Sequence, residues 1–128
     1  MADLPSPIVD FVPPLTWFTL QEGEGNLLKT LTTITTAGTT QLPGSATTYN
    51  DIYVNVAGVV TIEMPLISKM FEGQEWQVKD TGGNAGSFAI TVIPGDSYEI
   101  DNFTSYTLNN NYASISFIWN GTNMSIKI

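Results

Sequence analysis

The 128-residue chain has no cysteine, no histidine and no arginine. Without cysteine it can form neither a disulfide framework nor a thiolate nucleophile. Histidine is the side chain that most often transfers protons near neutral pH, so its absence excludes hydrolysis by a Ser–His–Asp triad. Zinc sites in most proteins use His or Cys ligands, so no zinc site is expected. We therefore predict that the protein is not an enzyme and that it holds no cofactor and no metal.

Charge is also scarce and mostly of one sign. Twelve acidic residues and four lysines give a net charge of −8, and charged residues make up 12% of the chain, about half of the usual share. No basic stripe is present to neutralise phosphates, so we expect no nucleic-acid partner and no anionic membrane surface. Thr, Ser, Asn and Gly take the polar positions instead. Such a surface suits packing within a larger assembly, and it suits equally an ordinary β-domain with a neutral surface.

Long hydrophobic runs are missing too. No stretch of about 18 apolar residues is present to cross a bilayer. The first 20 residues carry acids and prolines without a basic start, which does not fit a secretory signal peptide. We expect the protein to be used in the cytoplasm where it is made, or to be released by lysis.

The segment 1–14 is rich in proline. Because proline lacks an N–H and disfavours helix in the residue before it, we expect this segment to run extended. One interpretation is an attachment arm that binds a neighbouring subunit or partner, and the other is a terminal strand that covers its own domain. In the first interpretation the contact residues are the apolar ones, namely Ile8, Val9, Phe11 and Val12.

Residues 15–128 have the pattern of a single β-domain, and the length suits one core. Apolar and polar residues alternate in several short runs, for example over 60–64, 76–79, 88–93, where Phe88, Ile90 and Val92 share the apolar face, and 114–119. One apolar side per strand is what two antiparallel sheets packed face to face require. The sequence therefore predicts an all-β fold, a small antiparallel β-sandwich or jelly roll.

Local signals place two connections. Asn120-Gly121 favours a hairpin that pairs Ser114–Trp119 with Met124–Ile128, because both residues tolerate positive φ. Residues 66–72 are the best candidate for a helix, of one turn at most. The glycine-rich run 82–86 is not followed by a phosphate-loop lysine, so we interpret it as a turn, with Asn84 in the left-handed conformation.

Two segments carry a resemblance to a known family. The first is Val-Lys-Asp-x-Gly-Gly-Asn-Ala-Gly at 78–86, and the second is Tyr-x-Ser-x-x-x-x-Trp-Asn-Gly-Thr-Asn at 112–123. Over about residues 52–128 the chain resembles the small β-domain of tailed-bacteriophage virion proteins, of the tail-fibre and capsid-decoration type. One departure is that Glu99-Ile100-Asp101-Asn102 lacks the glycine that usually ends the turn in that pattern.

The resemblance implies a structural role. It implies a virion protein that is assembled in the host cytoplasm, that contacts other capsid or tail proteins and that forms a homotrimer. We expect a capsid decoration or fibre-like protein that attaches through its arm and its β-surface. The sequence does not distinguish capsid from tail.

Two alternatives stay open. A receptor- or glycan-binding fibre tip would use exposed aromatic rings to stack on sugars of a host glycan; the candidate residues are Tyr98, Phe103 and Tyr106. A polysaccharide-cleaving enzyme would need a carboxylate pair, for which Asp96, Glu99 and Asp101 are the candidates. The same carboxylates would suit Ca²⁺, or they simply form a solvated edge.

Overall fold

The computed structural model describes residues 29–127, and the described residues from Leu31 onward form one compact unit. Strands dominate this unit, with a single turn of 3-10 helix, η2 (Ile67–Lys69), among the described residues. The all-β prediction is confirmed. The strands are β1 (Lys29–Ile34), β2 (Gly38–Gln41), β3 (Tyr49–Val54), β4 (Val60–Glu63), β5 (Glu75–Asp80), β6 (Ile90–Ile93), β7 (Tyr106–Leu108), β8 (Ser114–Trp119) and β9 (Met124–Lys127).

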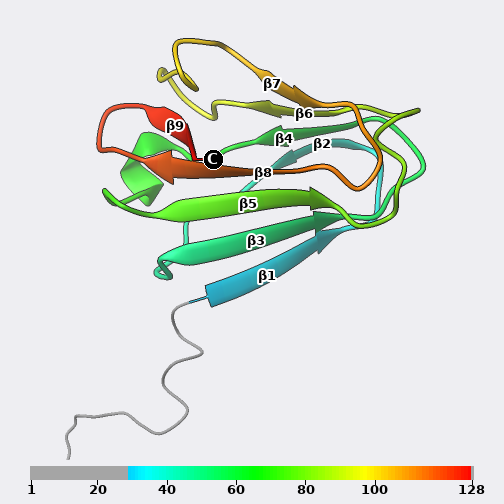
Figure 1. Ribbon diagram of the computed structural model, residues 1–128. Helices are drawn as coiled ribbons and strands as arrows, with labels where there is room; N and C mark the ends of the chain where they lie inside the picture. The colour runs from blue at the N-terminus through cyan, green and yellow to red at the C-terminus, as the bar shows by residue number, and fades with distance from the viewer. Residues whose placement is uncertain (1–28, 128) are drawn as a thin grey trace, which may run out of the picture. The chain divides into compact units, whose positions relative to one another are not determined.

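The strands form two sheets (Figure 1). A five-stranded sheet has the order β1-β3-β5-β8-β9, and a four-stranded sheet has the order β2-β4-β6-β7. From β1 to β6 the chain therefore crosses to the other sheet after every strand. Only β6–β7 and β8–β9, among the described strands, are consecutive neighbours within one sheet.

This winding makes both sheets mixed. The pairs β2–β4, β4–β6 and β3–β5 are parallel, whereas β5–β8, β6–β7 and β8–β9 are antiparallel. The prediction of a purely antiparallel sandwich or jelly roll is therefore wrong in strand direction. The physical reason is that the chain leaves one sheet, runs along a strand of the other sheet and then returns. It therefore enters the first sheet again in its original direction, parallel to the strand that it left. Alternation of side chains is the same in parallel and antiparallel strands and carries no information on direction.

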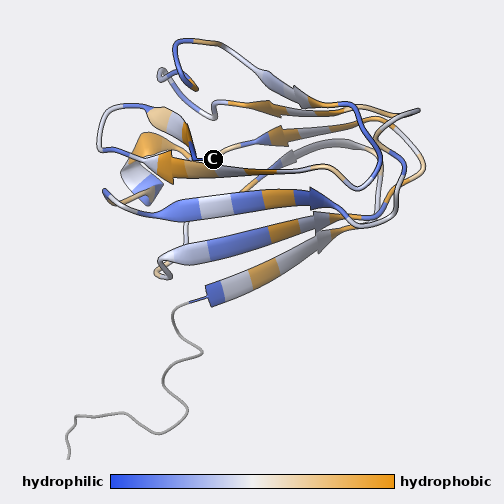
Figure 2. Cartoon of the chain, in the orientation of Figure 1, coloured by the Kyte–Doolittle hydropathy of each residue, from blue (hydrophilic) through white to orange (hydrophobic). Residues whose placement is uncertain are grey.

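Buried side chains of both sheets belong to one hydrophobic cluster. Ile62 and Val92 from the four-stranded sheet and Val78 and Phe117 from the five-stranded sheet are fully buried. Each such side chain contributes about 1.5–3 kcal/mol relative to an exposed one. Hydrophobic and hydrophilic residues alternate along the strands in Figure 2. The predicted apolar faces of β4, β5 and β8 are confirmed, but Phe88, expected on the apolar face of β6, precedes the strand and is exposed.

A row of threonines crosses the outer face of the four-stranded sheet. Successive register partners are Thr39, Thr61, Thr91 and Thr107, one on each strand. Thr61 and Thr91 on the central strands are half-buried, and the outer two are exposed. Cross-strand Thr–Thr pairs stabilise a sheet through methyl packing and hydroxyl hydrogen bonds. The result is a regular face with little charge.

Both local predictions of connections are confirmed. Trp119 faces Met124 across the β8–β9 hairpin, and Gly121 at its turn has φ +97°. The side chain of Asn120 accepts hydrogen bonds from the amides of Thr122 (2.9 Å) and Asn123 (2.8 Å), which closes the turn. η2 is the single turn expected within 66–72, and Gly73 follows it with φ +91°.

Candidate functional site

A buried carboxylate lies where β5 ends. Asp80 is 1% exposed, and its carboxylate accepts hydrogen bonds from three backbone amides. The donors are Gly83 at 3.1 Å, Ala85 at 2.9 Å and Tyr112 at 3.0 Å. The first two belong to the loop that crosses from β5 to β6, and the third belongs to the loop between β7 and β8. One side chain thus joins two loops that lie far apart in the sequence.

These amides keep Asp80 charged. Burial by itself raises the pKa of the carboxyl, because it disfavours the ionised form. The hydrogen bonds from Ala85, Tyr112 and Gly83, with the nearby backbone amide of Asn84, together outweigh burial and lower the pKa of Asp80 below its ordinary value. A buried carboxylate with its acceptor sites occupied by amides is suited to holding loops in place, and those same bonds make it a poor proton donor.

Tyr112 lies above this carboxylate in an uncommon backbone conformation. Its φ is +63°, which bulky residues rarely adopt, and its side chain is 60% exposed. The end of the ring packs on Gly83, where an added Cβ would lie 2.4 Å from Cζ of Tyr112. Lys79 donates a hydrogen bond from Nζ to the carbonyl of Tyr112, and Nζ lies 5.9 Å from the ring centroid. The backbone of Tyr112 is therefore bound by Asp80 and Lys79, and the end of its ring packs on Gly83.

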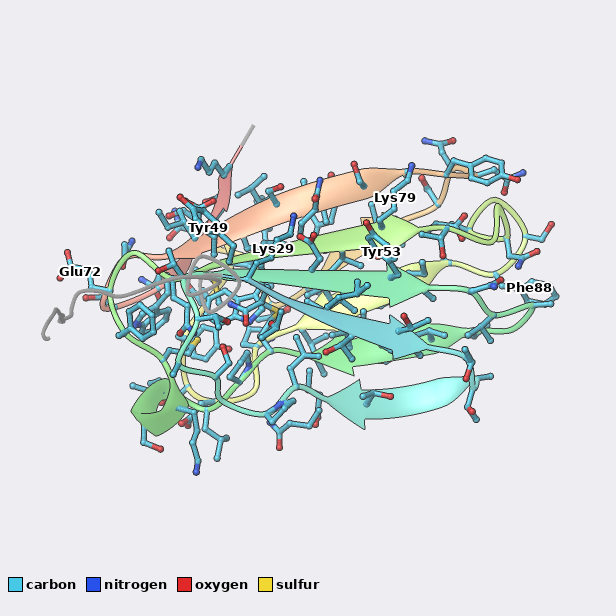
Figure 3. All side chains as sticks on the ribbon, turned by 90° about the horizontal axis from the view of Figure 1, so that it is seen from below. Lys29, Tyr49, Tyr53, Glu72, Lys79 and Phe88 are labelled. Atoms are coloured by element: carbon cyan, nitrogen blue, oxygen red, sulfur yellow. The ribbon has the colours of Figure 1, made fainter. Side chains whose placement is uncertain are left out.

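A further hydrogen bond joins loop 81–89 to the loop between β7 and β8. The amide of Gly86 donates to Oδ1 of Asn111 at 2.8 Å. The prediction that this glycine-rich run forms a turn is confirmed, but it is a crossing between sheets, and the positive φ lies at Gly83 (+73°) instead of Asn84. Figure 3 shows Lys79 beside Tyr53 on the outer face of the sheet, with Phe88 at the same end. We call this cluster of Lys79, Tyr112, Asn111 and loop 81–89 the Tyr112 site.

A second polar junction fixes loops elsewhere in the domain. Gln74 is fully buried, and its Nε2 donates to the carbonyls of Ser45 (3.0 Å) and Thr47 (2.9 Å). Asn50 accepts from the hydroxyl of Ser45 at 2.6 Å and donates to the carbonyl of Glu75 at 3.0 Å. These two amides tie the 42–48 loop to the start of β5, so its geometry is set by buried hydrogen bonds.

The three aromatic residues predicted to contact a receptor lie in different environments. Tyr98 is 5% exposed: its ring packs edge-on against Trp119 with centroids 5.0 Å apart, and its hydroxyl donates to the carbonyl of Pro65 at 2.8 Å. Tyr106 is half-buried against Phe117, and Phe103 is 66% exposed. The expectation that Tyr98 is exposed is wrong, because the 94–99 segment turns its ring into the core. A receptor contact at Phe103 stays a prediction.

The predicted carboxylates lie beside a tight turn. Glu99 and Asp101 are exposed while Tyr98 and Ile100 between them are buried, as alternation predicts. Asp101 (φ +47°) and Asn102 (φ +67°) have positive φ values in this turn, and Ile100 pairs with Phe103. Oδ1 of Asp101 accepts from the amide of Ile126. No group of three or more Asp or Glu residues suited to a metal occurs among residues 29–127.

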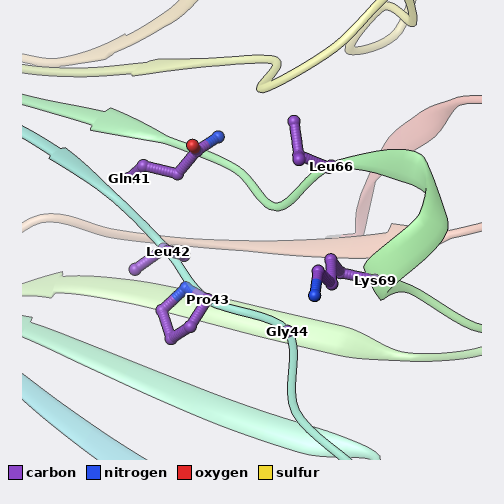
Figure 4. Close-up of a pocket in the computed structure, with 6 residues that line it drawn as sticks. All are labelled: Gln41, Leu42, Pro43, Gly44, Leu66 and Lys69. Atoms are coloured by element: carbon purple, nitrogen blue, oxygen red, sulfur yellow. The ribbon is translucent and has the colours of Figure 1, made fainter.

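An open pocket of about 300 Å³ lies next to η2 (Figure 4). Gly44 passes so close to Lys69 that an added Cβ would lie 2.7 Å from Cβ of Lys69. Its lining residues include two leucines, a proline and a lysine, and no carboxylate lies among them. The lining residues are Gln41, Leu42, Pro43, Gly44, Leu66 and Lys69.

Sequence reasoning did not single out Lys79, Asp80 or Tyr112 as functional residues, and all three entered only as positions in the two segments that carry the resemblance. A signal was present, because an aspartate at a strand end before Gly-Gly-Asn is typical of a side chain that caps the following turn. The bond to Tyr112, 32 residues away, had no such signal.

The predicted arm residues Ile8, Val9, Phe11 and Val12 lie outside the described residues. Within residues 29–127 no helix has the length and hydropathy of a membrane span. The chain matches no protein-family model, and a search of curated proteins finds no significant match.

Proposed function

We propose that this protein is a structural accessory protein of a tailed-phage virion, a capsid decoration or fibre-like protein that acts by adhesion and catalyses no reaction. The observation that carries the proposal is the contact made by Asp80. The two segments that resemble phage virion domains, 78–86 and 112–123, meet at its carboxylate through the amides of Gly83, Ala85 and Tyr112. The matched residues therefore act together in space, which favours a shared fold over chance similarity of turns.

The architecture that we propose is a sandwich of two mixed sheets preceded by an extended arm, residues 1–14. A single buried cluster with members from both sheets supports face-to-face packing. The junctions at Asp80 and Gln74 fix loops by buried hydrogen bonds, which suits a domain that must present a constant shape to its neighbours.

We propose that copies of the chain contact one another through the threonine face, which is the outer face of the four-stranded sheet that carries Thr39, Thr61, Thr91 and Thr107. Three copies would lie around one axis. The central positions of this face, Thr61 and Thr91, are uncharged and regularly spaced. Three strands of four residues and one of three, about 4.8 Å apart, cover only about 240 Å². A standard interface buries about 800 Å² per partner, so the arm must supply the remaining contact. The apolar residues of the arm, above all Ile8, Phe11 and Val12, would then bury against a neighbouring virion protein.

Particle imaging tests the location. The protein would be found on assembled particles, as expected for a chain made in the host cytoplasm and incorporated during assembly. Deletion of residues 1–14 is expected to leave a folded domain that no longer binds particles. A deletion variant that still co-sediments with particles would refute the attachment arm.

Mass photometry of the full chain tests the trimer. Thr61→Lys with Thr91→Lys places like charges at the proposed contact and is expected to give monomers, because charges at an interface core are costly to desolvate. Ser116→Lys, on the outer face of the other sheet, is the matched control and is expected to leave the trimer intact. A wild-type chain that stays monomeric at micromolar concentration would refute the trimer.

A receptor- or glycan-binding fibre tip is the second candidate, favoured by the 66% exposure of Phe103. In this proposal the Phe103 ring contacts a cell-surface polysaccharide. Phe103→Ala would then reduce adsorption of particles to host cells while leaving the amount of protein per particle unchanged. Unchanged adsorption would remove this candidate.

A further inference from the structure

We propose that the Tyr112 site binds a carbohydrate by stacking a pyranose ring on the exposed face of Tyr112. The proposal goes beyond the structural role and does not depend on it. It also concerns other residues than the predicted receptor contact, since neither Phe103 nor Tyr106 belongs to the Tyr112 site.

The ring of Tyr112 is exposed and yet fixed. Its backbone amide is bound by Asp80, its carbonyl by Lys79, and the end of its ring rests on Gly83. A tyrosine that is already ordered loses little conformational entropy when a ligand covers it. The C–H groups on one face of a pyranose carry partial positive charge and match the negative face of the aromatic ring.

The backbone of Tyr112 supports the same interpretation. A φ of +63° in a bulky residue costs about 1–2 kcal/mol. Residues with a strained backbone conformation that surrounding hydrogen bonds hold in place are frequent at binding sites.

Lys79 supplies hydrogen-bond donors over one side of the ring, with Nζ 5.9 Å from the ring centroid. Its ammonium group has three N–H donors, of which the carbonyl of Tyr112 uses one. Lys79 forms no ion pair with a carboxylate of residues 29–127, unlike Lys127, which pairs with Glu75 at 3.0 Å. Sugar hydroxyl oxygens can accept the remaining donors. Tyr53, the register partner of Lys79 on β3, borders the lysine on its other side.

The side-chain amide of Asn111 completes the site. Asn111 uses Oδ1 to accept from Gly86, and its amide nitrogen makes no hydrogen bond to another described residue. A carboxamide offers a donor and an acceptor at the spacing of two neighbouring sugar hydroxyls. An aromatic face, an ammonium group and an amide around one open surface favour a hydroxylated ring over an apolar ligand or a bare anion.

Because the site is open, affinity for a single sugar is expected to be weak, with Kd about 1 mM. The probes are glucose, galactose and N-acetylglucosamine, with their β-linked disaccharides, added to the full chain. Saturation-transfer NMR is expected to show transfer to ring C–H protons of at least one probe. The amide signals of Gly83 and Gly86 are expected to shift with the same Kd.

Variants separate stacking from folding. Tyr112→Ala is expected to weaken binding at least about tenfold, whereas Tyr112→Phe keeps the ring and binds as wild type. Tyr49→Ala removes another exposed tyrosine ring, at the start of β3 and outside the site, and is expected to leave sugar binding unchanged. Thermal unfolding checks that each variant is folded.

A glycine pair gives a second, independent test. Gly83→Ala adds a Cβ where the ring lies, and Gly73→Ala adds one at a similar positive φ with nothing within 4 Å. Both introduce backbone strain, but only Gly83→Ala displaces Tyr112 and is expected to weaken binding. Binding that survives Tyr112→Ala would overturn the proposal. The proposal would also be overturned if the wild type bound none of the sugars, or if it bound polyglutamate, an anionic polymer without a sugar ring, in their place.

Discussion

The backbone amide of Tyr112 donates a hydrogen bond to Oδ2 of Asp80 at 3.0 Å, across 32 residues of sequence. Asp80 ends β5 and Tyr112 precedes β8, and these two strands pair antiparallel with Lys79 opposite Ser114. The bond therefore fixes the place where the chain returns from the four-stranded sheet to the five-stranded sheet. Loss of the carboxylate should loosen the loops on both sides of it.

Asp80→Asn is expected to destabilise the domain by roughly 2–3 kcal/mol, because a neutral amide replaces an acceptor of three backbone hydrogen bonds and turns a donor toward other donors. The free energy of unfolding in urea measures this. Glu99→Gln is the control: it removes one exposed carboxylate whose side chain makes no hydrogen bond within residues 29–127. Equal stability of the two variants would contradict the structural role of Asp80.

The free energy of unfolding is expected to decrease as the pH is lowered through the acid range, and Asp80 is one cause of this decrease. Its pKa in the folded state is lowered, so the unfolded state binds more protons and stability rises with pH between the two pKa values. The contribution is fully present above the ordinary pKa of 3.8 and is lost as pH falls through the folded-state pKa. Unfolding at a series of pH values should show the difference between wild type and Asp80→Asn shrinking in that window. A constant difference would contradict it.

Gln74→Ala is expected to cost roughly 2–4 kcal/mol, since it leaves buried carbonyls of the 42–48 loop without a donor and opens a cavity. Gln77→Ala is the matched control, because Gln77 is the same residue type on the exposed face of β5, the strand that follows Gln74. Its effect should stay within about 0.5 kcal/mol. Thermal or urea unfolding distinguishes the two; similar losses would show that the buried amide network is not decisive.

Trp119→Ala is expected to cost roughly 3–5 kcal/mol, since Trp119 is 3% exposed. The edge-on contact with Tyr98 should appear as coupling of about 0.5–1.5 kcal/mol in a double-mutant cycle of Tyr98→Leu and Trp119→Leu. Tyr106→Leu combined with Trp119→Leu is the control: Tyr106 packs on Phe117, so these effects should add. Absence of coupling in the first pair would place Tyr98 outside the packed core.

Much of the local structure could be predicted from the sequence. The apolar faces of β4, β5 and β8 follow from alternation with period two, and the β8–β9 hairpin follows from Asn120-Gly121. The exposure of Glu99 and Asp101 follows from the same alternation. These features depend on neighbours a few residues apart, which is the range over which sequence patterns carry information.

The candidate site was not predictable in the same way. Tyr98 and Tyr112 are both tyrosines in loops, yet one is a core residue with a bonded hydroxyl and the other presents its ring to solvent. The two differ in the segments that the fold brings next to each ring. Tyr98 meets the carbonyl of Pro65 inside the core, whereas Tyr112 meets Gly83 at the surface.

The sequence by itself determined that the protein is made of strands, which side of most strands is buried, and where the tightest turns lie. These follow from the pleat and from glycine and asparagine at positive φ, both of which are local. Tertiary structure alone decided that successive strands alternate between sheets and pair in parallel, and that Asp80 collects amides from two distant loops. Such choices depend on contacts between segments far apart in the chain, whose free energy no short window of residues contains.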